Sequence, residues 1–143
     1  MATGDVTIFT AASALDYFEG WAATNTMRLA ILDNTTAPTA GTATPALGDF
    51  TEVGAAGTYT SGGTSLGTWG DMAAAGILDS TTNPSWAANG SNDADAWWGL
   101  IYNDTVAGDP ALAFVELGGP VDMSAVTLQV TWNASGIATV TLS

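Results

Sequence analysis

The apolar residues of this chain occur in short runs, and residues that favour turns interrupt almost every run. The clearest example lies near the C-terminal end, where residues 126–132 alternate apolar and polar side chains, residues 133–136 favour a turn, and residues 137–142 again favour a strand. A period of two is typical of a strand with one buried face. The pattern therefore predicts a β-hairpin over residues 126–142.

Further short segments along the chain have the same strand-like composition. Residues 96–102 and 111–117 are separated by a polar loop, which predicts a second hairpin. The other predicted strands are 27–32, 65–69, and a pair at 50–53 and 58–60 around a glycine-containing turn. Short strands separated by turns predict a mainly β fold, an antiparallel β-sandwich or flattened barrel in a single domain over 1–143, with the sandwich itself in 27–143.

The N-terminal part contains the one segment that favours a helix. Residues 10–19 begin with capping residues and are followed by a glycine, so we expect a short amphipathic helix there. The preceding residues 6–9 are expected to form either a first strand or part of an extended arm over 1–9. Three apolar side chains in this segment need a surface to cover them and are candidate interface residues: Val6, Ile8 and Phe9.

The charge balance is extreme: fourteen acidic residues stand against one basic residue, Arg28, and the net charge is −13. Nucleic acids and anionic membranes bind proteins through lysine and arginine. We therefore expect neither a nucleic acid nor a membrane among the partners. The chain is nonetheless expected to fold, because 47% of its residues are hydrophobic and a disordered acidic segment would have far fewer.

Catalytic chemistry has few possible carriers in this sequence, which contains no histidine, cysteine or lysine. Those residues are the commonest general acids, bases and nucleophiles. A carboxylate pair, Asp93 or Asp95 with Glu52 or Glu116, is the remaining arrangement, and nothing in the sequence brings two of them to a defined separation. We expect no enzymatic activity, no catalytic residues and no cofactor.

Three aspartates are candidates for calcium ligands. Asp93 and Asp95 lie in the segment Asn-Asp-Ala-Asp, and Asp104 follows an asparagine, so oxygen ligands gather in predicted loops, as a hard cation prefers. The spacing matches no EF-hand, and aspartate and asparagine also occur in turns for reasons of backbone geometry. We therefore expect no specific metal site.

Six tryptophans are many for a chain of this size. Trp97 and Trp98 are adjacent within a predicted strand, so their side chains point to opposite faces, and one of them leaves the main core unless another surface covers it. Trp86 lies in a predicted loop soon after a proline. These three tryptophans are candidate interface residues, with packing inside the chain and stacking on a sugar ring as the alternatives.

The order of these segments resembles that of small virion proteins of tailed bacteriophages, the capsid cement or head-decoration proteins. The resemblance rests on the strand 27–32, the loop 36–38, the stretch 50–53 that leads to Tyr59, the segments 84–86, 99–102 and 111–117, and the Gly-Ile pair at 136–137. Similar proteins often have an arginine soon after the tyrosine. Here Tyr59 is followed by Thr-Ser-Gly-Gly, so the sequence departs from similar proteins at this point and has no arginine to make that contact.

The resemblance implies a non-enzymatic structural protein on the outer surface of the virion, made in the host cytoplasm. Its partners would be the major capsid protein, whose neighbouring subunits it would bridge, and copies of itself in a homo-oligomer, with a trimer favoured. The acidic balance fits the outside of the shell and not its DNA-facing side. The alternative is a tail-tip or fibre module that binds host surface polysaccharide through exposed tryptophans.

Overall fold

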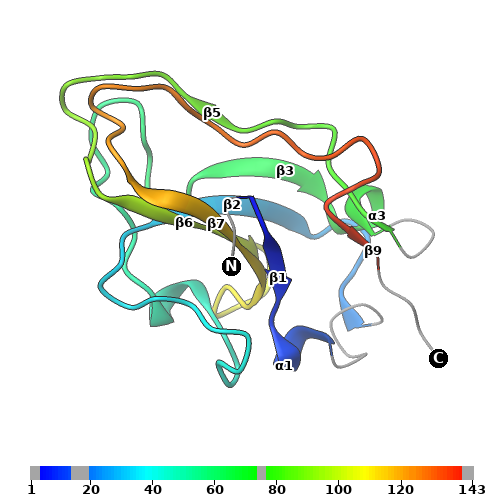
Figure 1. The fold of residues 1–143 in the computed structure, drawn as a ribbon. Coiled ribbons are helices and arrows are strands. Elements are labelled where there is room, and N and C mark those ends of the chain that lie inside the picture. The colour runs from blue at the N-terminus through cyan, green and yellow to red at the C-terminus, as the bar shows by residue number, and fades with distance from the viewer. Residues whose placement is uncertain (1–3, 14–19, 74–76, 140–143) are drawn as a thin grey trace.

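The computed structural model describes residues 4–13, 20–73 and 77–139. Within them the fold is mainly β, as predicted, and helix is confined to single turns (Figure 1). The strands are β1 (Val6–Ile8), β2 (Thr26–Leu32), β3 (Thr64–Thr68), β4 (Ile77–Leu78), β5 (Ser85–Trp86), β6 (Ala96–Asn103), β7 (Ala111–Val121), β8 (Leu128–Gln129) and β9 (Ala138–Thr139). The helical turns are α1 (Thr10–Ser13), η1 (Leu47–Asp49) and α3 (Trp69–Met72).

Five strands form one antiparallel sheet in the order β1-β7-β6-β2-β3. The predicted strand at β2 and the predicted hairpin of β6 and β7 are both present. Most residues of β2 and β6, and the first half of β7, are buried, because protein covers both faces of the sheet. This two-sided burial explains why their sequences read as continuous apolar runs and do not alternate.

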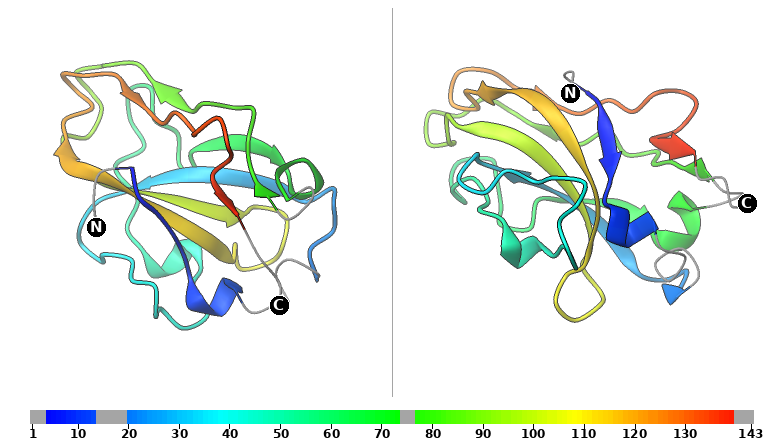
Figure 2. Two further views of the ribbon diagram at one scale, coloured as in Figure 1. Left: turned by 45° about the vertical axis from the view of Figure 1, so that its right-hand side comes forward. Right: turned by 60° about the horizontal axis from the view of Figure 1, so that its bottom comes forward.

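A smaller layer covers one face of the sheet and consists of two ribbons, β4 with β9 and β5 with β8. Figures 1 and 2 show the chain around β5 running beside the orange and red C-terminal segment over the larger sheet. The result is a β-sandwich whose two layers differ greatly in size. The predicted sandwich architecture is therefore confirmed.

The hairpin predicted over residues 126–142 is wrong, as far as the described residues extend. Its turn is present, with the Gly136 amide donating to the Asn133 carbonyl oxygen at 2.9 Å, but the two arms then separate. One arm pairs with β5 and the other with β4. The alternation of apolar and polar residues shows which face of a strand is buried, but it does not show which strand is the partner. Pairing with β5 allows both Leu128 and Val130 to be buried against the sheet.

The strand pair predicted at residues 50–53 and 58–60 does not form either. The Val53 amide instead donates to the Ile31 carbonyl oxygen at 3.0 Å, so the first segment runs beside β2. The second segment wraps over this edge and buries Tyr59. The turn between them is present, but the backbone groups of its first arm pair with the end of β2 that extends beyond β3, in place of a short local hairpin.

The N-terminal predictions have different outcomes. The helix predicted over 10–19 begins as α1, and residues 14–19 lie outside the described residues. The residues before it form β1, which pairs with β7 at the edge of the sheet, so residues 6–8 are a strand of the domain and not a free arm. No helix in the described part of the chain is long and apolar enough to cross a membrane.

Candidate functional site

The three N-terminal interface candidates have different environments. Val6 and Ile8 are half-buried on β1 and pack against the edge of the core. Phe9 is fully buried, with its ring centroid 5.1 Å from that of Phe114 and 6.1 Å from that of Phe50. A side chain without exposed surface makes no contact with a partner, so Phe9 is no longer a candidate and the other two remain.

The three candidate tryptophans also differ. Trp86 is only 5% exposed, because β5 turns it toward the sheet, and it is therefore a core residue. Trp98 packs edge-on against Phe114, with ring centroids 5.9 Å apart. Trp97 is half-buried, and its indole nitrogen donates to the Asp95 carboxylate at 2.7 Å. Of the adjacent pair, Trp98 therefore packs against the core and Trp97 remains the better interface candidate.

The candidate calcium ligands are divided between the two ends of β6. Asp93 and Asp95 precede the strand and Asp104 follows it, so about 30 Å of extended chain separates them. Asp93 accepts a hydrogen bond from the Gly54 amide at 3.0 Å, and Asp104 lies 3.9 Å from the Arg28 guanidinium. Within residues 4–13, 20–73 and 77–139 no three carboxylates, histidines or cysteines are arranged to hold a metal ion. The three aspartates do not form one site.

The two glutamates considered for a catalytic pair form internal hydrogen bonds. The Glu52 carboxylate accepts from the Tyr59 hydroxyl at 2.6 Å and from the Gly62 amide at 2.7 Å. Burial, together with this carboxylate, raises the pKa of Tyr59 well above its ordinary value, so the phenol stays a donor. Glu116 accepts from the Gly118 amide at 3.1 Å. Glu52 thus holds the loop 59–63 in place, whereas the Glu116 contact is local to β7.

Arg28 also binds the loop 59–63, to which Gly62 belongs. Its guanidinium donates to the carbonyl oxygens of Gly62 and Gly63 at 3.0 and 2.7 Å, and the Tyr102 hydroxyl donates to the Gly62 oxygen at 2.8 Å. Burial raises the pKa of Tyr102 to about 12, which keeps its proton in place at neutral pH. This cluster could not be predicted from the sequence, because its hydrogen-bonded partners lie 34 to 40 residues apart and share no motif.

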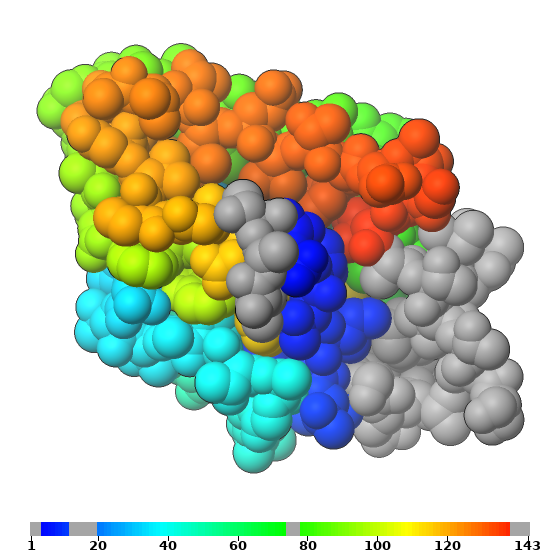
Figure 3. All heavy atoms as spheres, viewed as in Figure 1, coloured from blue at the N-terminus to red at the C-terminus, as the bar shows by residue number. Residues whose placement is uncertain are grey.

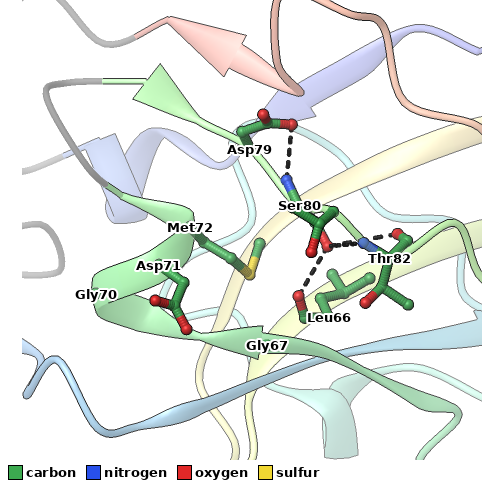
Figure 4. Close-up of a pocket in the computed structure, with 9 residues that line it drawn as sticks. Leu66, Gly67, Gly70, Asp71, Met72, Asp79, Ser80 and Thr82 are labelled. Carbon is green, nitrogen blue, oxygen red and sulfur yellow. Dashed lines mark hydrogen bonds between the residues drawn. The ribbon is translucent and has the colours of Figure 1, made fainter.

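A cavity of about 480 Å³ lies between β3 and residues 79–82 (Figure 4). Asp71 and Asp79 line it, and Figure 4 shows that their carboxylates do not converge on a common point. Asp71 accepts a hydrogen bond from the Thr68 hydroxyl at 2.6 Å, and Asp79 accepts one from the Ser80 amide at 2.7 Å. Two carboxylates that point apart, each with an internal donor, do not provide a catalytic arrangement.

The strongest candidate for a binding site is an open seam between β1 and the C-terminal part of the smaller layer. Two adjoining grooves of about 250 and 290 Å³ form this seam. Figure 3 shows the blue N-terminal strand beside the orange and red residues that form the opposite wall. The residues that define the seam are Gly4, Val6, Leu117, Val130, Thr131 and Trp132.

The first wall of the seam is the outer edge of β1. The Asp5 carbonyl oxygen and the Phe9 amide both hydrogen-bond to the β7 backbone, each at 3.1 Å. Antiparallel pairing uses every second residue, so the backbone N–H and C=O groups of Val6 and Ile8 point away from β7. No described residue hydrogen-bonds to these outward groups.

The second wall is the outer edge of the chain that continues from β8. The Val130 amide donates to the Pro84 carbonyl oxygen at 2.9 Å, and the Trp132 amide bonds on the same side. The backbone groups of Gln129 and Thr131 therefore point in the opposite direction, toward the seam. No described residue hydrogen-bonds to them. The seam thus lies between two strand edges that both have unused hydrogen-bonding groups.

Comparisons with known proteins found no relative of this chain. No protein-family model, no curated protein and no solved structure matches this chain. The class that the fold itself defines is a mainly β sandwich, and its most distinctive surface feature is the seam.

Proposed function

We propose that this chain is a non-enzymatic structural protein of a tailed bacteriophage, a cement protein that binds the outside of the capsid and stabilises contacts between major capsid protein subunits. The resemblance in the order of its segments motivates this proposal. The arrangement of charge is the observation that supports it most strongly.

The only cation of the chain is directed inward, while many acidic side chains face solvent. Arg28 donates to the carbonyl oxygens of Gly62 and Gly63 and lies beside Asp104. A surface of this kind is repelled by packaged DNA and is attracted to basic protein surfaces, which favours the exterior of a shell. The exposed acidic residues include Asp49, Asp71, Asp95, Asp104 and Asp122.

The polysaccharide-binding alternative has less support. Stacking on a sugar requires an indole face that is open to solvent, and all six tryptophans are buried or half-buried. The indole nitrogens of Trp97, Trp98 and Trp132 donate to oxygen atoms of the chain itself. Among the described residues, the large apolar side chain that is clearly exposed is that of Val126, at 50%.

Copy number in purified particles tests the cement assignment. A cement protein repeats over the whole shell, so we expect an amount comparable with that of the major capsid protein. Quantitative gel densitometry of intact particles, with a tail protein of the same phage as the internal reference, measures this ratio. A ratio equal to that of the tail protein would contradict the cement assignment and favour the tail-tip or fibre module.

We further propose a homo-oligomer, most simply a trimer at local three-fold positions of the shell, with Trp97 at the contact. Since each chain carries a net charge of −13, we expect self-association to strengthen as salt screens the repulsion. Analytical ultracentrifugation at low and moderate ionic strength measures the effect. Trp97→Ala should weaken association, whereas Val126→Ala, the matched exposed control, should not. A monomer under both conditions would contradict the oligomer.

A further inference from the structure

We propose that the seam binds an extended segment of a basic partner protein by strand addition. The proposal rests on the two facing strand edges and not on the capsid assignment. Outward backbone groups of Val6 and Ile8 form one edge, and those of Gln129 and Thr131 form the other. An extended peptide has N–H and C=O groups on both sides, so one inserted strand can bond to both edges.

The two edges belong to different layers of the sandwich. The β1 edge ends the five-stranded sheet, and the edge at Thr131 ends the ribbon of β5 and β8. A strand inserted between them would join the layers and close this side of the sandwich into a barrel-like wall. Removal of two open edges at once is a gain that a strand added to a single edge does not provide.

The side chains in the seam indicate which residues the segment should carry. Leu117 and Trp132 are half-buried in its walls, and Val130 is 7% exposed. Alternate side chains of an inserted strand point toward this apolar floor, so every second residue should be apolar. The residues between them point outward to solvent and are free to be polar.

The net charge of the chain indicates that the segment is basic and comes from another protein. The chain has fourteen acidic residues. The chain has one cation, Arg28, and its donors are bonded to Gly62 and Gly63. A segment with lysine or arginine therefore supplies the missing counter-charge, whereas a second copy of this chain, with a net charge of −13, brings repulsion.

A synthetic peptide tests strand addition directly. The probe is acetyl-Lys-Val-Thr-Val-Thr-Val-Lys-amide, and the controls are the same peptide with glutamate for both lysines and with proline for the central valine. Amide hydrogen exchange of the full chain, followed by NMR, reports the backbone groups one by one. We expect the probe to slow exchange at Val6 and Thr131, and both control peptides to slow it much less.

Proline variants of the protein test the same hydrogen bonds. Thr131→Pro and Val6→Pro each remove an outward N–H without removing a bond of the existing sheet, and each should weaken probe binding about tenfold. Ser85→Pro is the matched control, because the Ser85 N–H points to the opposite edge of the same ribbon, and it should retain the wild-type affinity. Thermal melting identifies any variant that fails to fold.

Three results would overturn the proposal. One is unchanged exchange at Val6 and Thr131 in the wild-type protein at millimolar probe, a measurement that does not depend on any variant. Another is protection confined to the β3 edge at Thr64–Thr68. The third is equal binding by Ser85→Pro and by a folded Thr131→Pro.

Discussion

Replacing Phe9 with alanine is expected to lower the free energy of unfolding by about 3–5 kcal/mol. Phe9 has no exposed surface and contacts the rings of Phe50 and Phe114, so its removal leaves a cavity between the sheet and the segment that contains Phe50. A loss of this size is a large part of the about 5–15 kcal/mol that stabilises an ordinary domain. Urea denaturation of the wild type and the variant measures the difference.

The matched control is Val126→Ala, since Val126 is 50% exposed and its truncation should change the free energy of unfolding by less than about 0.5 kcal/mol. The comparison also decides between the strand and the free arm. If residues 6–9 were an arm used only to contact another protein, both variants would unfold at the same urea concentration. Equal midpoints would therefore contradict the placement of β1 in the sheet.

Replacing Gly63 with alanine is expected to cost about 3–5 kcal/mol, from steric overlap and backbone strain together. Gly63 has a φ of +66°, and a methyl group there would collide with the Leu29 carbonyl and lie 2.8 Å from the Ala30 Cα. The atoms in the way are backbone atoms of β2, which cannot move without disturbing the centre of the sheet. The Gly63 carbonyl oxygen also accepts the Arg28 hydrogen bond.

The substitution Gly108→Ala measures the cost of backbone strain without steric overlap. Gly108 has a φ of +88°, and no atom lies within 4 Å of the place that a methyl group would take, so its replacement should cost only the backbone strain, about 1–2 kcal/mol. The same urea denaturation measures both variants. Equal destabilisation by the two substitutions would show that the loop 59–63 does not pack against β2 as described.

The main features of the fold could be predicted where the signal was local. The composition and the short apolar runs indicated a mainly β chain, and the segments at β2, β6 and β7 were recognisable because each has a continuous apolar sequence bounded by turn residues. The need to bury Phe9 was also evident from the sequence. Its covering surface was not, because Phe50 and Phe114 are distant in the chain.

The candidate site was predicted only in part. Val6 was selected for its apolar side chain, yet its role in the seam depends on which way its backbone groups point, and that follows from the pairing of β1 with β7. Thr131 gave no signal at all, since an outward threonine in an alternating segment is an ordinary surface residue. Trp86, chosen as an interface residue, is buried because β5 pairs with β8.

The sequence by itself determined the strand-forming composition, the net charge and the absence of histidine, cysteine and lysine, because these depend only on which residues are present and on their immediate neighbours. The tertiary structure alone decided the partners of β8 and β9, the contacts of Arg28 with the loop 59–63, and the two open edges of the seam. Alternation specifies which side of a strand is buried. The choice of partner depends on the total apolar surface that distant segments bury together, and no local pattern encodes that sum.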